Sequence, residues 1–170
     1  MPGFVIHLAI GQEYLRKQNK NYSEEFQKGI VAPDFIDDKS KTHYGKSPRY
    51  TNLKKFLDNN KIDTDFNKGF FLHLITDYLF YNYYVTNTGK SVLYNDYDIT
   101  NKSIMEKYNV TLLDSVKDKV FFKEGVPEIL TLELSYKIID EISNVNLERI
   151  KEEVNKNLSR WNYYKKWRRK

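Results

Sequence analysis

The chain has 170 residues, a net charge of +5, 15% aromatic residues and no cysteine. This length suits one domain with its own core, and we predict a single domain over residues 1–170. Without cysteine, disulfides, thiolate metal sites and cysteine nucleophiles are excluded, so a metal would need histidine, carboxylate or water ligands.

The first apolar run, Phe4–Ile10, is short, contains His7 and has no positively charged region before it. These features are not those of a signal peptide or a membrane span, and we therefore expect a cytoplasmic protein.

Helical spacing of apolar residues dominates the first sixty residues. A Ser before the second apolar group is typical of a helix start, and a Gly-to-Pro stretch is typical of a helix end. The pattern predicts a helix from Phe4 to about Arg16, a short helix capped by Ser23 and ending at Gly29–Pro33, a polar loop over Phe35–Pro48, and a helix over Tyr50–Leu57.

The most apolar helix is predicted next, starting at Asp63 or Asp65 and continuing to about Val85 without proline. Apolar and aromatic residues cover most of its circumference, which indicates a helix surrounded by others. His73 and Asp77 are four residues apart within it and therefore share one face. A buried carboxylate requires a partner, so we expect a histidine or a metal ion beside Asp77.

The second half of the chain is also predicted to be helical, with no convincing pair of strands. Together the two halves indicate an all-α, single-domain multi-helix bundle of about seven helices. In chain order the predicted features are a turn over Thr86–Gly89, a polar loop over Asn95–Asn101, a helix capped by Thr100 and ending at Tyr108, an ambiguous stretch over Val110–Phe122, a helix from Pro127 to Ile142, and a last helix capped by Asn146 and continuing through Leu158.

The C-terminal tail, Arg160–Lys170, holds six basic residues and no acidic one. A charge run of this kind is usually a solvated helix end, whose Trp and Tyr side chains here would pack against the rest of the protein. The alternative is contact with an anionic membrane surface or a nucleic acid backbone.

The three histidines, His7, His43 and His73, are the strongest indication of a site. His43 lies in the first polar loop, nine residues after Asp34, and His73 shares its helical face with Asp77. Imidazole and carboxylate together suit zinc, iron or manganese. Taken singly, these residues have ordinary alternatives. His7 can be an interior histidine, His43 a loop histidine, His73 and Asp77 a hydrogen-bonded pair, and Pro33-Asp34 a turn.

The order of these motifs resembles the zinc-dependent phospholipase C family. An early helical histidine is followed by Gly29-x-x-x-Pro33-Asp34, then Thr42-His43, then His73-x-x-x-Asp77, within residues 1–85. The resemblance implies the all-helical fold that this family shares with single-strand-specific zinc nucleases. It also implies a first metal site of Asp34, His43, His73 and Asp77, and a second site that begins with His7 and Asp77.

The chain departs from that family after His73, because no histidine follows it. The later His-x-x-x-Glu ligands of the family are therefore missing, and the chain does not open with the family's N-terminal tryptophan. We expect one divalent ion, or two completed by carboxylates. Zinc is the expected ion, with iron or manganese as alternatives.

A metal of this kind activates water for attack on phosphorus, which predicts a hydrolase acting on a phosphomonoester or phosphodiester, including lipid-derived ones. Asp38 and Asp98, with Asp96, are the candidates for a carboxylate that orients or deprotonates the water. Lys41, Lys46 and Arg49 flank His43 and are candidates for binding a phosphate group; the alternative is a solvated loop.

Two rival hypotheses remain open. One is an HD-domain phosphohydrolase, which is also helical and built from His and Asp, although no adjacent His-Asp dipeptide occurs in the chain. The other is a non-catalytic helical domain that binds metal and contacts membrane or nucleic acid through its tail.

Overall fold

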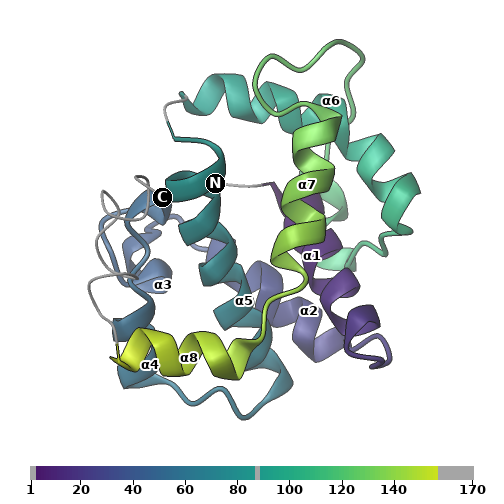
Figure 1. The fold of residues 1–170 in the computed structure, drawn as a ribbon. Helices are drawn as coiled ribbons and strands as arrows, with labels where there is room; N and C mark the ends of the chain where they lie inside the picture. The colour runs from purple at the N-terminus through teal and green to yellow at the C-terminus, as the bar shows by residue number, and fades with distance from the viewer. Residues whose placement is uncertain (1–2, 87–88, 157–170) are drawn as a thin grey trace. The chain divides into compact units, whose positions relative to one another are not determined.

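The computed structural model describes residues 3–86 and 89–156, and within these residues every regular element is helical (Figure 1). The predicted all-α, multi-helix fold is therefore confirmed, and the part of the chain that the structure describes contains eight α-helices where about seven were expected. The α-helices are α1 (Phe4–Lys17), α2 (Glu24–Val31), α3 (Ser40–His43), α4 (Leu53–Asn59), α5 (Asp65–Leu79), α6 (Lys90–Tyr108), α7 (Leu132–Ile142) and α8 (Leu147–Lys156). The shorter elements are the 3₁₀ turns η1 (Ala32–Asp34), η2 (Pro48–Tyr50) and η4 (Asp114–Lys119), and the π-helical η3 (Phe80–Tyr84).

The described residues form two compact units, one of residues 23–86 and 145–156, the other of residues 3–22 and 89–144. The prediction of one domain over the whole chain stays a prediction. None of the described helices is both long and apolar enough to cross a membrane. The basic tail over residues 160–170 lies outside the described residues, so its predicted partners stay predictions.

Local capping signals explain most helix starts. Ser23 and Asn146 cap α2 and α8 as predicted, through hydrogen bonds from Phe26 N and Arg149 N. The central helix α5 begins at Asp65, one of the two predicted starts, and is capped by Thr64, whose hydroxyl accepts from Asn67 N at 3.1 Å.

Two predictions in the first polar region were wrong. The stretch Phe35–Pro48 is not all loop, because α3 forms a single helical turn within it. The next helix, α4, begins at Leu53 after the cap Asn52 and not at Tyr50, since Pro48 and the two residues after it form a 3₁₀ turn.

In the first unit, α5 packs against α2, α4 and α8. The contact with α2 is close because a glycine on each helix faces the other backbone. A Cβ atom added at Gly29 would lie 2.0 Å from the Phe66 carbonyl oxygen, and one added at Gly69 would lie 2.1 Å from the Phe26 carbonyl oxygen. Only residues without a side chain allow this approach, which brings the last turn of α2 beside the middle of α5.

We predict that Gly69→Ala destabilises the protein by about 1–3 kcal/mol or more, because the added methyl group must push two backbones apart. Alanine also favours a helix over glycine by about 1 kcal/mol, and the clash has to outweigh this gain. The free energy of unfolding in urea measures the effect. Gly89→Ala is the matched control, since a Cβ at Gly89 has nothing within 4 Å. Equal stability of the two variants would contradict the close approach.

In the second unit, α1 packs against α6 and α7. The predicted loop Asn95–Asn101 and the predicted cap Thr100 were wrong, because α6 continues through both. The polar residues there bond to other segments from within the helix. The buried Asp96 carboxylate accepts hydrogen bonds from the backbone N–H groups of residues 128, 129 and 130 at 2.8–2.9 Å, and the Asn101 amide donates to the Phe121 carbonyl.

The predicted helix start at Pro127 was wrong. Residues 128–130, whose N–H groups bind Asp96, are non-helical, and α7 begins at Leu132 after the cap Thr131. The helix ends at Ile142 as predicted. The ambiguous stretch Val110–Phe122 contains only the short turn η4.

We predict that Asp96→Ala lowers the free energy of unfolding by about 3 kcal/mol or more, since it leaves three backbone donors without their acceptor. Urea denaturation followed by circular dichroism measures the loss. Asp98→Ala, at a half-buried position of the same helix, is the control and should cost less than about 1 kcal/mol. Similar losses of unfolding free energy in both variants would show that the three hydrogen bonds of Asp96 add no extra stability.

Candidate metal centre

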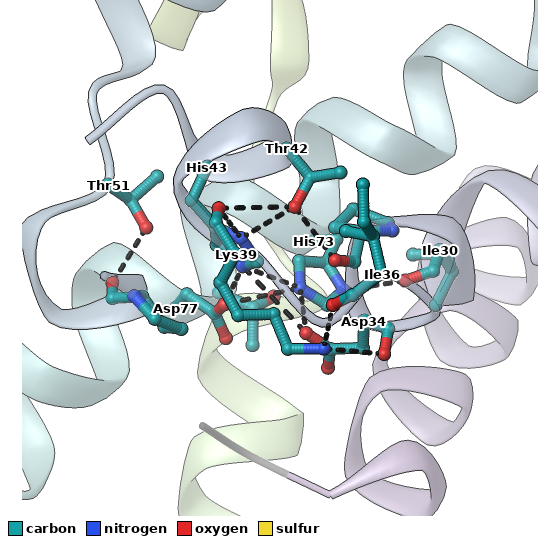
Figure 2. A network of polar contacts seen from close by, with 12 residues as sticks. Ile30, Asp34, Ile36, Lys39, Thr42, His43, Thr51, His73 and Asp77 are labelled. Carbon is teal, nitrogen blue, oxygen red and sulfur yellow. Dashed lines mark hydrogen bonds and ion pairs between the residues drawn. The ribbon is translucent and has the colours of Figure 1, made fainter. Parts of the chain in front are cut away.

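Four predicted ligands meet in the first unit: Asp34 from η1, His43 from α3, and His73 and Asp77 from α5 (Figure 2). One potential ligand atom of each lies within 4.8 Å of those of the other three. All four side chains are at most 1% exposed. The centre is thus shielded from bulk water, which strengthens every electrostatic interaction within it.

The orientation of His73 depends on the contact between α2 and α5. The ring of His73 lies one helical turn beyond Gly69, and its Nδ1 atom is 2.6 Å from the carbonyl oxygen of Ile30. Ile30 belongs to the last turn of α2, where carbonyl groups have no partner within the helix. A carbonyl oxygen can only accept, so Nδ1 carries the proton and the Nε2 lone pair faces the centre.

His43 is oriented in the same way by its own segment. Its Nδ1 atom is 3.1 Å from the Lys39 carbonyl oxygen and 3.1 Å from the Thr42 hydroxyl. Thr42 donates its own proton to the Pro33 carbonyl at 2.8 Å, which leaves its oxygen free to accept. Nδ1 of His43 is therefore the donor, and its Nε2 atom also faces the centre.

The facing atoms form a set of acceptors. The two Nε2 atoms are 3.3 Å apart, and Asp77 Oδ2 is 2.7 Å from that of His43 and 3.2 Å from that of His73. Asp34 Oδ1 completes the set, 3.8 Å from His43 Nε2 and 3.5 Å from His73 Nε2. Lone pairs and carboxylates cannot share this volume without a cation, which is either a proton or a metal ion.

The electrostatics of His73 show how strongly the centre attracts positive charge. Burial disfavours the charged imidazole, but the carboxylates of Asp77 and Asp34 outweigh burial and raise the pKa of His73 from 6.5 to about 10. Such an environment favours a cation beside the His73 ring.

As metal ligands, these same four acceptor atoms fit a divalent ion. Metal bonds of about 2.0–2.1 Å place the ligand atoms of a tetrahedral site roughly 3.3 Å apart. The separations that involve an imidazole nitrogen run from 2.7 to 3.8 Å, and all four ligand atoms lie within 4.8 Å of one another. Two imidazole nitrogens and two carboxylate oxygens suit zinc, iron or manganese, and the carboxylates balance the charge of a divalent ion. The cluster could therefore hold a divalent metal.

His7 belongs to the second unit, where it is buried on α1. Its assignment to a second metal ion stays a prediction.

The carboxylates predicted to activate water have other contacts. Asp38 is exposed and accepts hydrogen bonds from the backbone and hydroxyl of Ser40, which lower its pKa. Asp98 is half-buried on α6 in the second unit, and burial raises its pKa. Asp96 binds three backbone N–H groups, as described above. Their assignment to catalysis stays a prediction.

The basic residues beside His43 differ from one another. Lys41 and Lys46 are exposed, as the solvated-loop alternative expects. Arg49 is half-buried, donates to the Thr86 carbonyl at 2.9 Å and lies 5.2 Å from the centre of the Tyr81 ring. Binding of a phosphate group by these residues stays a prediction.

Sequence reasoning missed the carbonyl groups of Ile30 and Lys39 that orient the two imidazoles. Backbone acceptors carry no residue-type signal. The indirect signals were the helix end before Pro33 and the position of Lys39 one helical turn before His43, which a helical reading of that loop would have revealed.

Comparisons of the chain with protein-family models, with curated proteins and with solved structures find no match. The likeness to the zinc-dependent phospholipase C family therefore stays a prediction from the motif order.

We predict that zinc, manganese or ferrous iron raises the melting temperature of the metal-free protein with a stoichiometry near one per cluster. Binding to the folded state alone adds about 2.7 kcal/mol of stability at a metal concentration 100 times Kd. Differential scanning fluorimetry and elemental analysis measure both effects.

The metal-induced shift should be lost in His73→Ala and Asp77→Ala, since each removes a donor. Comparing each variant with and without metal corrects for its own change in stability. An unchanged shift in His73→Ala would place the metal elsewhere. A shift that survives His7→Ala would show that His7 is not needed for this ion.

Proposed function

We propose that the protein is a metal-dependent hydrolase that cleaves phosphoester bonds at the centre formed by Asp34, His43, His73 and Asp77. The observation that carries the proposal is the pair of buried Nε2 atoms, 3.3 Å apart, that face two carboxylates. The motif order within residues 1–85, which resembles zinc-dependent phospholipase C, supports the choice of phosphoesters. The substrate class comprises phosphomonoesters and phosphodiesters, including lipid-derived ones.

A divalent ion, when bound, supplies Lewis-acid chemistry: it lowers the pKa of a bound water and neutralises charge on phosphoryl oxygens. The chain's own residues supply the geometry and charge. The Nδ1–H groups of His43 and His73 hold both rings in place, and Asp34 and Asp77 offset two positive charges. We propose zinc as the ion because it suits these four donors; iron and manganese accept the same set.

One observation favours a second function, a structural metal site. Zinc sites with four protein donors are typically closed, whereas catalytic ones keep a position for water. Here four donors are present and all are buried. An ion bound to all four would join η1, α3 and α5, and so stabilise the first unit without turnover.

We predict that the metal-loaded protein hydrolyses generic phosphomonoester or phosphodiester substrates, that a chelator abolishes turnover, and that added metal restores it. His73→Ala should lower kcat/KM by more than about 100-fold, because loss of residues that merely orient metal ligands costs about 10–100-fold. Asp37→Asn, an exposed carboxylate in the segment between Asp34 and His43, is the control and should retain activity.

Each outcome separates the hypotheses. Turnover that survives in His73→Ala would come from another site and reject the proposal. Metal-dependent stability without turnover on any substrate of the panel would favour the structural function. A loss of about 10²–10⁴-fold in Asp38→Asn or Asp98→Asn, with metal affinity unchanged, would identify the general base.

A further inference from the structure

The segment that joins Asp34 to His43 supplies one donor from each of its ends. Only its last four residues form a helix, α3, and most of its side chains are exposed. Its backbone must nevertheless keep a carboxylate and an imidazole directed at one point. The contacts of this segment therefore matter for the geometry of the centre.

One residue in the segment, Lys39, is half-buried and directs its ammonium group back toward the start of the segment (Figure 2). Its Nζ atom donates to the carbonyl oxygen of Asp34 at 2.6 Å and to that of Ile36 at 2.7 Å. A charged donor makes stronger hydrogen bonds than a neutral one, and two such bonds close a compact turn around Asp34.

The backbone of Lys39 contacts the other donor. Its carbonyl oxygen accepts from the backbone N–H of His43 at 2.9 Å and lies 3.1 Å from Nδ1 of the His43 ring. The side chain of Lys39 thus fixes the residue that carries one carboxylate, while its carbonyl fixes the ring of one imidazole. Among the described residues of this segment, Lys41 has the same chemistry but is exposed.

We propose that Lys39 is a positioning residue of the metal centre, which sets the distance and direction between the Asp34 carboxylate and the His43 imidazole. Without the ammonium group, the turn from Asp34 to Ile36 loses two hydrogen bonds, which weakens the placement of the Asp34 carboxylate beside the other three ligands. The inference rests on the metal site used by the proposed function, but not on hydrolysis.

The test compares Lys39→Met, which keeps an unbranched side chain one atom shorter than lysine and removes the donors, with Lys41→Met as the matched control. Affinity for Zn²⁺ is measured by competition with a chromophoric chelator, and the ligand geometry by the visible absorption spectrum of the Co²⁺-loaded protein. We expect Lys39→Met to bind Zn²⁺ roughly 10–100-fold more weakly and to change the Co²⁺ spectrum, because residues that orient metal ligands have effects of this size. Lys41→Met should match the wild type in both.

Lys39→Gln keeps one side-chain donor and provides a second variant if Lys39→Met does not fold; its affinity should lie between those of the wild type and Lys39→Met. Wild-type affinity and an unchanged Co²⁺ spectrum in the folded variants would overturn the proposal, even if the metal-free variants were less stable. Failure of the wild type to bind Zn²⁺, Mn²⁺ or Fe²⁺ would reject both this proposal and the proposed function. If metal binding depends on Lys39 but no phosphoester is hydrolysed, the result would support this proposal and reject only the hydrolase function.

Discussion

The first unit is built around four buried acceptor atoms, two imidazole nitrogens and two carboxylate oxygens, which together require a cation. Both imidazoles donate their Nδ1 protons to backbone carbonyls, so their Nε2 lone pairs must face each other and two carboxylates. In an interior from which water is excluded, this arrangement is stable only with positive charge at its centre. A divalent ion would bind all four acceptor atoms at once, whereas a proton bridges only two of them.

Helix packing makes this arrangement possible. The reciprocal glycines, Gly29 and Gly69, let α2 and α5 approach until the final turn of one lies beside the middle of the other. His73 then reaches the Ile30 carbonyl, which a helix end leaves without a partner. The two glycines therefore help to position the ligands of the centre through helix packing, although they contact none of the ligand atoms.

The sequence predicted the helical fold class, two of the helix caps and the four metal ligands, because these depend on short-range patterns. Apolar spacing and the capping residues Ser23 and Asn146 act within one or two helical turns. The donors were recognisable by type and order, since His73 and Asp77 are one helical turn apart. The prediction failed at residues 95–101, where a polar composition typical of loops belongs to a helix with a buried Asp96.

By itself, then, the sequence determined that the fold is helical and which side chains are able to bind a metal. Tertiary structure alone decided that Asp34, His43, His73 and Asp77 meet, and that the Ile30 carbonyl orients the His73 imidazole. It also decided that Asp96 binds the backbone N–H groups of residues 128–130. The physical reason is range: helical periodicity and capping act between near neighbours, whereas these contacts join residues up to 43 positions apart, whose pairing no local pattern encodes.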